Sequence, residues 1–231
     1  MKKIFFISMM AMMFSLTASA QFYPDGRPIH PSKRGGYHHR HESPRHSIPD
    51  TYSGVRFGLG LATVNSDSPY LDGNEVKTGF YGGLAFGVSM SYNTPIFFET
   101  GVYFSQKGGK SEYDGDKFTY NLDYVEFPVV FKYKAPVADK VTIEPFAGGF
   151  LSCGVGGKIK DYQNRAAYSS FSNEYYDNFR RFDAGLRIGC GLSVDQFYVE
   201  AAYDFGLANV GKNDFEDTHT GAANISVGFN F

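Results

Sequence analysis

Few residues in this sequence have the types and spacing that acyl transfer or hydrolysis requires. Outside residues 21–50 the chain contains a single histidine, His219. A nucleophile needs a base within hydrogen-bond distance, yet His219 is followed by Thr220 and Gly221, and Ser226 stands seven residues later. We therefore interpret His219 as a solvated loop residue, and we predict no catalytic residues and no enzymatic activity.

Carboxylates offer a second chemistry. Acidic residues at Glu99, Glu126, Glu200 and Asp204 could support paired-acid catalysis, in which one carboxyl group donates a proton and another accepts one. Basic residues in the same alternating segments favour a structural network of salt bridges instead. The predicted network consists of Arg56, Glu99, Glu126, Lys132, Asp183, Arg187, Glu200 and Asp204.

Metal-binding residue types are concentrated in residues 21–50, which hold five of the six histidines, including His38, His39 and His41. Imidazoles bind Zn, Cu or Ni. The same segment has five prolines and almost no aliphatic residues, so it cannot bury enough apolar area to fold. We predict no cofactor and no defined metal site, and we interpret 21–50 as a disordered, basic periplasmic arm whose charge responds to pH. A weak adventitious metal site is the alternative.

Residues 1–20 have the features of an export signal. Lys2 and Lys3 are followed by an apolar run at 4–16 that is too short to span a bilayer as a helix, and then by the small residues 18–20. We predict cleavage after Ala20. No later stretch approaches the roughly 18 apolar residues that a membrane helix needs.

Residues 51–231 alternate between apolar and polar side chains with a period of two. The alternation covers the segments 55–61, 80–92, 98–105, 125–132, 182–194, 197–206 and 223–231. Such alternation indicates strands whose two faces meet different surroundings. The segment 141–155 is less regular, because Phe146 and Phe150 fall on the face opposite Ile143; a bulge near Pro145 or at 148–149 would explain this. Together these segments predict eight strands.

The links and charges indicate which face meets lipid. Short links fall near 93–94, 135–140 and 195–196, and long polar links at 65–77, 108–121, 158–179 and 208–221, as in outer-membrane barrels. Charged residues avoid the apolar face of the regular strands, which is expected in lipid. Aromatic residues near strand ends, such as Tyr52, Phe80 and Phe197, indicate interfacial girdles. We predict an all-β, eight-stranded antiparallel up-and-down transmembrane β-barrel in the cell outer membrane of a Gram-negative cell envelope. The alternative is a soluble lipocalin-like barrel with the apolar face inside.

The two cysteines, Cys153 and Cys190, invite a disulfide in an oxidising compartment. A hairpin centred near residue 169 would place Cys153 opposite residue 185. The offset of five residues from Cys190 is about 16 Å along a strand, which exceeds the reach of a disulfide. We predict that both are free.

One strand-length motif resembles a known family. Residues 122–133 read LDYVEFPVVFKY, which is similar to the fourth-strand motif of the PorT-type outer-membrane β-barrel family, where a Tyr and a Glu precede a Pro and then a Lys. Residues 182–186 and 201–207 match its later strands in style, and the resemblance covers about 51–231. It implies an OmpA-like barrel closed by its first and last strands, with the terminal Phe231 as a signal to the barrel assembly machinery. It implies no shared catalytic residues.

Partners are indicated by charge and by one loop. The 22 basic and 24 acidic residues nearly balance, so we predict no nucleic-acid partner. The aromatic residues of the third long link are a candidate recognition surface: Tyr162, Tyr168, Phe171, Tyr175, Tyr176 and Phe179. The alternative is that these rings pack over the barrel mouth.

The function that we predict is a non-enzymatic anchor in outer-membrane lipid, with external loops for binding or adhesion to an unidentified external ligand. The arm at 21–50 could contact peptidoglycan, anionic lipid or nothing. The alternatives are a soluble periplasmic carrier, a lipid-A-modifying enzyme and a narrow pore, although side chains fill the interior of eight-stranded barrels.

Overall fold

The structure is a computed structural model that describes residues 51–66, 71, 75–91, 94–113, 116–160, 167–172, 178–215 and 217–231. The chain divides into two units, Met1–His46 and Ser47–Phe231. The predicted export signal and the predicted arm lie outside the described residues. Within the described ranges, no helix has the length and apolar character needed to cross a membrane.

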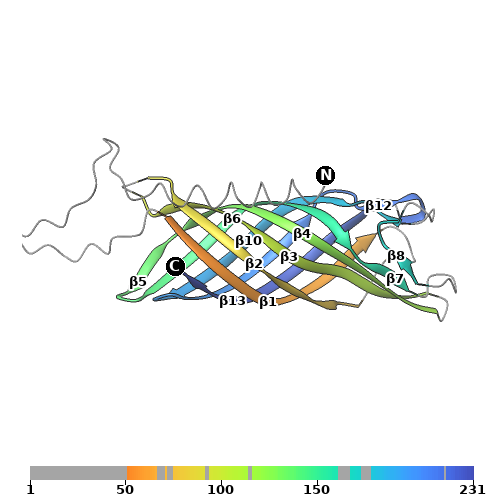
Figure 1. Cartoon of the computed structure of the whole chain (residues 1–231), viewed down its shortest axis with the longest axis horizontal. Coiled ribbons are helices and arrows are strands. Elements are labelled where there is room, and N and C mark those ends of the chain that lie inside the picture. Colours follow the sequence, from red (N-terminus) through yellow and green to blue (C-terminus); the bar gives the residue numbers. More distant parts are fainter. Residues whose placement is uncertain are drawn as a thin grey trace, which may run out of the picture. The chain divides into compact units, whose positions relative to one another are not determined.

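Eight antiparallel strands of the second unit form a closed ring. They are β1 (Thr51–Ser66), β2 (Lys77–Ser89), β3 (Ile96–Tyr113), β4 (Asp116–Tyr133), β6 (Val141–Gly156), β10 (Phe182–Val194), β11 (Phe197–Gly206) and β13 (Thr218–Asn230). Each pairs with the next of these eight along the chain, and β13 closes the ring against β1, from Gly54 opposite Asn230 to Ser66 opposite Thr218. The predicted up-and-down barrel is confirmed. Its strands are strongly tilted (Figure 1), as barrel closure requires.

The two rims of the barrel differ in the length of their links. The short-turn rim carries β5 (Ala135–Ala138), which pairs with β6, and the turn between β10 and β11. The long-loop rim carries β7 (Lys158–Lys160), β8 (Tyr168–Ser169), β9 (Asn178–Phe179), β12 (Gly211–Lys212) and the short helix η2 (Asn213–Phe215). Here β7 pairs with β4 and with β8, and β9 pairs with β12. Figure 1 shows β5 at one end of the barrel and β7, β8 and β12 at the other.

The prediction of a loop at 108–121 was wrong. In the structure β3 continues to Tyr113 and β4 begins at Asp116, and the two strands stay paired as far as their ends. We call residues 106–113 and 116–123 the β3–β4 extension. The extension has polar residues at positions of both parities, so the period of two that marks a half-buried strand is lost, although its backbone still pairs.

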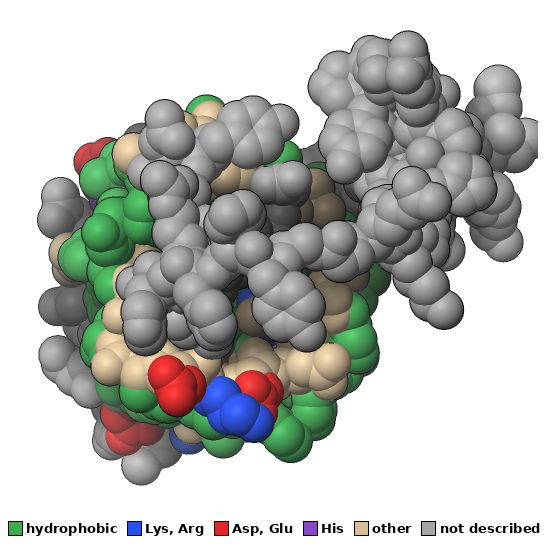
Figure 2. Space-filling model, turned by 90° about the vertical axis from the view of Figure 1, so that its left-hand side faces the viewer, with side chains coloured by type: hydrophobic (Ala, Val, Ile, Leu, Met, Phe, Trp, Pro, Cys, Tyr) green, Lys and Arg blue, Asp and Glu red, His purple; other side chains and the backbone are tan. Residues whose placement is uncertain are grey.

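Side-chain orientation matches a membrane barrel. Phe57, Leu186 and Val227 are 54%, 52% and 57% exposed on the outer wall, whereas Arg56 and Arg187 are 0% and 2% exposed inside. Seen from the end that carries β5, hydrophobic side chains gather on the outer wall and charged side chains at the rim (Figure 2). A water-soluble barrel buries its apolar face, so the soluble lipocalin-like alternative was wrong.

Two local predictions also need correction. No bulge occurs near Pro145 or Gly148: β6 pairs with β10 without a break, and Phe146 and Phe150 simply point into the lumen. The irregularity lies instead at the long-loop end, where the register of β4 against β6 shifts between Asp123 and Tyr124. Tyr52, predicted in an interfacial girdle, is buried in the lumen, because it has the same parity along β1 as Arg56.

Candidate functional site

The lumen is filled with charged and aromatic side chains. The described lumen residues include five cations and six carboxylates, all buried: Arg56, Lys107, Lys132, Lys134, Arg187, Glu99, Glu126, Glu144, Asp183, Glu200 and Asp204. The eight residues of the predicted charge network are all among them. The alternating pattern places them inside because every second residue of a barrel strand faces the axis.

Arg187, in the middle of β10, joins three carboxylates. Its Nη1 lies 2.9 Å from Asp204 Oδ1 and 3.3 Å from Glu126 Oε1, and its Nη2 lies 3.0 Å from Glu200 Oε1. Nη2 also donates a hydrogen bond of 2.8 Å to the Tyr81 hydroxyl. Because Tyr81 belongs to β2, four strands away around the ring, Arg187 bridges opposite walls of the barrel.

A second group of contacts lies closer to the short-turn rim. Lys132 Nζ lies 2.9 Å from Glu99 Oε2 and 3.6 Å from Glu200 Oε2, and it donates to the Tyr198 hydroxyl at 2.5 Å. Arg56 pairs with Glu99 at 3.7 Å, and its guanidinium lies 3.8 Å from the centre of the Tyr198 ring. Cation–π stacking of this kind strengthens in a desolvated site.

The network continues toward the long-loop rim through Lys107. Its Nζ lies 3.1 Å from Glu126 Oε2 and 3.3 Å from Asp183 Oδ2, and 4.1 Å from the centre of the Phe150 ring. The Thr220 hydroxyl donates to Asp183 Oδ2 at 2.8 Å. The three groups together form a continuous ionic column across much of the barrel.

The sequence prediction missed Lys107, Lys134 and Glu144. Lys134 Nζ lies 3.8 Å from Glu144 Oε1, which also accepts a hydrogen bond of 2.6 Å from Ser193. Lys107 shares its parity along β3 with Glu99, and Glu144 shares its parity along β6 with Phe146. Continuing the alternation through the ends of both segments would have placed both residues in the lumen.

Two lumen tyrosines lie against glycines on neighbouring strands. A Cβ atom added at Gly87 would come within 2.1 Å of the Tyr52 ring, and one at Gly191 within 2.2 Å of the Tyr198 hydroxyl. The close approach requires glycine at both places. Tyr52 in turn donates a hydrogen bond to Glu99. These ring–backbone contacts fill the space that the ionic column leaves.

The long-loop rim is closed by a hydrophobic cluster, which we call the mouth cluster. Its members are Val64, Leu71, Tyr120, Leu122, Tyr124, Ile159, Tyr168, Phe171, Phe179, Val210 and Phe215. Of the predicted loop recognition residues, Tyr168, Phe171 and Phe179 are buried in this cluster and pack over the mouth. Tyr162, Tyr175 and Tyr176 lie outside the described residues. The three described rings are thus part of the packing that holds the loops together.

Phe179 is the centre of the mouth cluster. Its ring lies 5.5 Å from that of Tyr120 and 5.4 Å from that of Phe215, between centroids, and so it joins the third and fourth long loops to β4. We expect Phe179→Ala to cost about 3–5 kcal/mol of local packing, and therefore to speed proteolysis of these loops in intact cells. The barrel itself should stay folded, and unboiled samples should keep the gel mobility of the wild type, since loops open independently of a stable core. Unchanged cleavage rates would show that the cluster does not hold the loops.

A family comparison decides what kind of barrel this is. Residues 49–212 match the model of the family described as an outer membrane protein beta-barrel domain. The chain belongs to this family. The apolar outer wall therefore faces the lipid of the outer membrane, and by the usual arrangement of such barrels the short-turn rim is periplasmic and the long-loop rim external.

Solved outer-membrane barrels are similar to this one in fold. Ail, the attachment invasion locus protein of Yersinia pestis, is 15% identical with a TM-score of 0.43, over 79% of this chain and 100% of Ail. Neisserial surface protein A is 12% identical with a TM-score of 0.47, over 79% and 98%. The N-terminal β-barrel domain of Pseudomonas aeruginosa OprF is 13% identical with a TM-score of 0.36, over 79% and 98%. No curated protein sequence matches the chain.

The other candidate chemistries of this outer-membrane barrel are not assembled by its described residues. The prediction of His219 as a solvated loop residue was wrong: it lies on β13, half-buried and facing away from the lumen. Ser226, an odd number of residues later on the same strand, is buried inside. Both cysteines are free and face lipid. Cys153 lies opposite Phe182, three residues from the predicted partner 185, and Cys190 opposite Pro145. The described ranges contain no cluster of three or more metal-ligating side chains; the histidines of 21–50 lie outside them.

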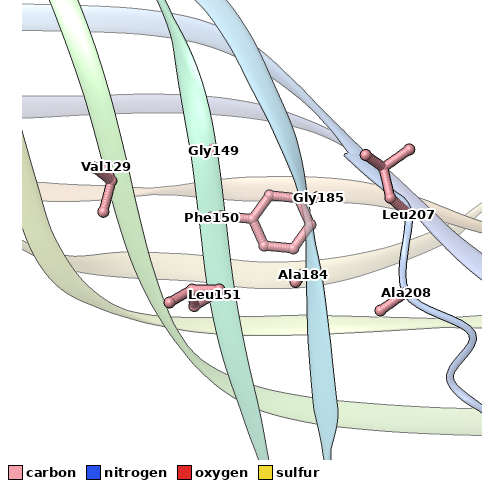
Figure 3. A pocket seen from close by; sticks show the side chains of 8 residues that line it. All are labelled: Val129, Gly149, Phe150, Leu151, Ala184, Gly185, Leu207 and Ala208. Carbon is pink, nitrogen blue, oxygen red and sulfur yellow. The ribbon is translucent and has the colours of Figure 1, made fainter.

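A shallow hollow lies in the outer wall of this outer-membrane barrel, and we call it the wall hollow (Figure 3). It is a largely open depression with a volume of about 570 Å³. It is lined by residues of β4, β6 and β10 and by the segment that follows β11: Val129, Gly149, Phe150, Leu151, Ala184, Gly185, Leu207 and Ala208. Pairing of β10 with β11 ends at Gly185 and Gly206. The amides of Leu207 and Ala208 then both donate to the Ala184 carbonyl, at 2.9 and 3.0 Å.

Proposed function

We propose that this outer-membrane barrel is a non-enzymatic membrane anchor whose external surface, built on the β3–β4 extension and the long-loop rim, serves binding or adhesion. The observation that carries the proposal is the division of the molecule into an occupied lumen and an enlarged external part. Arg187 and its partners cross the lumen from wall to wall, while β3 and β4 continue as a paired hairpin beyond the apolar band.

The same architecture argues against transport and catalysis. Side chains fill the interior of an eight-stranded barrel, and here they are held by several ion pairs, so a solute would have to break the column to pass. A hydrolase or acyltransferase needs a nucleophile beside its base, and His219 and Ser226 lie on opposite faces of β13.

Several finer features belong to the proposal. The motif at 122–133 supports membership of the PorT-type group, and the residue pattern of 1–20 supports an export signal cleaved after Ala20. A flexible arm at 21–50 would leave a folded domain at 51–231. The ligand of the external surface would be a molecule outside the cell, and peptidoglycan would be a ligand of the arm.

Electrical recording and cell adhesion together test the proposal. Purified protein in a planar bilayer should give no stable single-channel steps, and a reproducible unitary conductance would refute the anchor function in favour of a pore. Cells that carry the protein should be retained on at least one surface coated with heparin, mucin, collagen or fibronectin. A variant in which 108–121 is replaced by a two-residue turn should lose that retention while reaching the membrane in equal amount.

The last residue supplies a test of assembly. Phe231 is 71% exposed on the outer wall, and its amide and carbonyl pair with Ser53 on β1. If Phe231 is the signal to the assembly machinery, Phe231→Ala should reduce the amount of protein in the outer membrane. The free energy of unfolding of the purified variant should change by less than about 1 kcal/mol, as for most exposed substitutions. If pulse-chase fractionation finds Phe231→Ala in the outer membrane at the wild-type level, Phe231 is not the assembly signal.

A further inference from the structure

We propose that the wall hollow is a binding site for one acyl chain of a phosphorylated lipid of the outer leaflet, and that the cations above it bind the lipid's phosphate. The inference goes beyond the proposed function, because it concerns the lipid-facing wall and does not depend on what the loops bind.

The hollow has a definite structural cause. Three neighbouring positions on the outer wall carry almost no side chain, namely Gly149, Ala184 and Ala208, whereas Val129, Leu151 and Leu207 stand around them (Figure 3). The Phe150 ring forms part of the lining from the lumen side, because Gly185 has no side chain to displace it: a Cβ there would come within 2.8 Å of that ring.

The depth of the hollow fits the outer leaflet. Along β4 the outward apolar residues run from Tyr133 at the periplasmic edge to Val125 at the external edge, and Val129 stands midway. Along β10 Ala184 is one outward position below Phe182, the last apolar residue before the external rim. The hollow therefore extends from the middle of the apolar band to its outer edge. That span is half of a band about 25 Å tall, the half that outer-leaflet chains occupy.

Positive charge is concentrated at the external rim, beyond the outer end of the hollow. The Arg181 carbonyl accepts a hydrogen bond from Gly154, three residues along β6 from Leu151, so it lies about 10 Å along the strand from the hollow. The Arg181 guanidinium is held by the carbonyls of Gly154 and Phe171, at 2.9 and 3.5 Å. Arg180 next to it and Lys158 at the start of β7 are exposed.

These cations have no acidic partner within the described ranges. No salt bridge joins Arg180, Arg181 or Lys158 to a described carboxylate, although the lumen cations are all paired. Asp123, an acidic residue toward this end of β4, accepts a hydrogen bond from Gln106 at 3.2 Å. Exposed arginines are well suited to bind phosphate oxygens. An apolar groove that faces lipid, with unpaired cations at the external rim beyond it, matches an anionic lipid with long acyl chains.

Native mass spectrometry of the full barrel, titrated with diphosphoryl hexa-acyl lipid A, tests the proposal. The wild type should retain one lipid A through detergent exchange. Ala184→Phe fills the hollow and should weaken binding about tenfold, a change of about 1.4 kcal/mol in binding free energy. Ala201→Phe is the matched control, because Ala201 faces lipid on β11 outside the hollow, and it should bind as the wild type does. Equal binding by Ala184→Phe, or equal loss in Ala201→Phe, would overturn the acyl-chain site.

The phosphate contact is tested separately. The double variant Arg180→Glu with Lys158→Glu should bind diphosphoryl lipid A more weakly than the wild type does. Its affinities for diphosphoryl and monophosphoryl lipid A should also differ less than those of the wild type. If both lipids bind the double variant and the wild type alike, the cations are not part of the site. Should Ala184→Phe fail to fold, as judged by gel mobility of unboiled samples, Gly149→Leu fills the same hollow from β6. A Cβ at Gly149 meets only the Gly185 carbonyl, at 3.1 Å.

Discussion

Replacement of Arg187 by methionine should destabilise the barrel by about 3–5 kcal/mol, the cost of removing one partner of a buried ion pair. The reason is that Glu126, Glu200 and Asp204 would remain buried with their shared cation gone. Desolvated carboxylates that lose their partner are costly whether they stay ionised or take up protons. The measurement is equilibrium urea unfolding in lipid vesicles, followed by circular dichroism because the chain has no tryptophan.

Two variants separate the network from general damage. Lys140→Met breaks the exposed pair with Asp195, whose side chains are 69% and 55% exposed, and should cost less than about 1 kcal/mol. Arg187→Met combined with Asp204→Asn removes one of the stranded charges and should recover part of the loss. If Arg187→Met costs no more than Lys140→Met, the ionic column does not stabilise the lumen.

Introduction of arginine at Ile188 should cost about 2–4 kcal/mol, because this outward position stands at the middle of the apolar band on β10. Val194, at the periplasmic end of the same strand and on the same face, supplies the matched control. Arginine there reaches the membrane surface and should cost only about 0–1 kcal/mol. The same vesicle-based unfolding measures both variants.

The comparison between these two sites tests the orientation of the wall itself. A cost that depends on depth is expected only where lipid surrounds the side chain, since water would accept the arginine equally well at either position. Equal and small costs at Ile188 and Val194 would show that the outer wall meets water and would contradict the assignment of the faces.

The sequence predicted the barrel because two-faced strands leave a visible period. The segment around Arg187 alternates so regularly that the lumen side of β10 could be assigned residue by residue. Where both faces are polar, as in the β3–β4 extension, that signal vanishes and a paired hairpin was taken for a loop. Where aromatic rings fill the lumen, as with Phe146 and Phe150, side-chain polarity no longer distinguishes the lumen side from the lipid side. The alternation of positions along the strand still does.

The site was predictable only in part. Alternation could place Glu126 and Arg187 on the lumen side. The distance between them depends on the stagger between β4 and β10, which are not hydrogen-bonded to each other, and a single sequence does not reveal that stagger. The mouth cluster depends on long-range contacts between loops. Aromatic composition alone therefore could not decide whether Phe179 belongs to a recognition surface or packs over the barrel mouth. The wall hollow depends on Gly149 and Ala184 being diagonal neighbours across β6 and β10, and only the register between these two strands brings them together.

The hairpin tip between Tyr113 and Asp116 has a practical consequence. Eight residues of β3 from Gln106 onward, at about 3.4 Å each and tilted near 45°, would raise the tip roughly 20 Å above the apolar band. A peptide inserted there would be carried on a stiff stalk clear of the lipid headgroups, with its two ends already held a strand spacing apart. The barrel is therefore a natural scaffold for displaying foreign epitopes on living cells, and antibody staining of unpermeabilised cells would report both the topology and the height of the stalk.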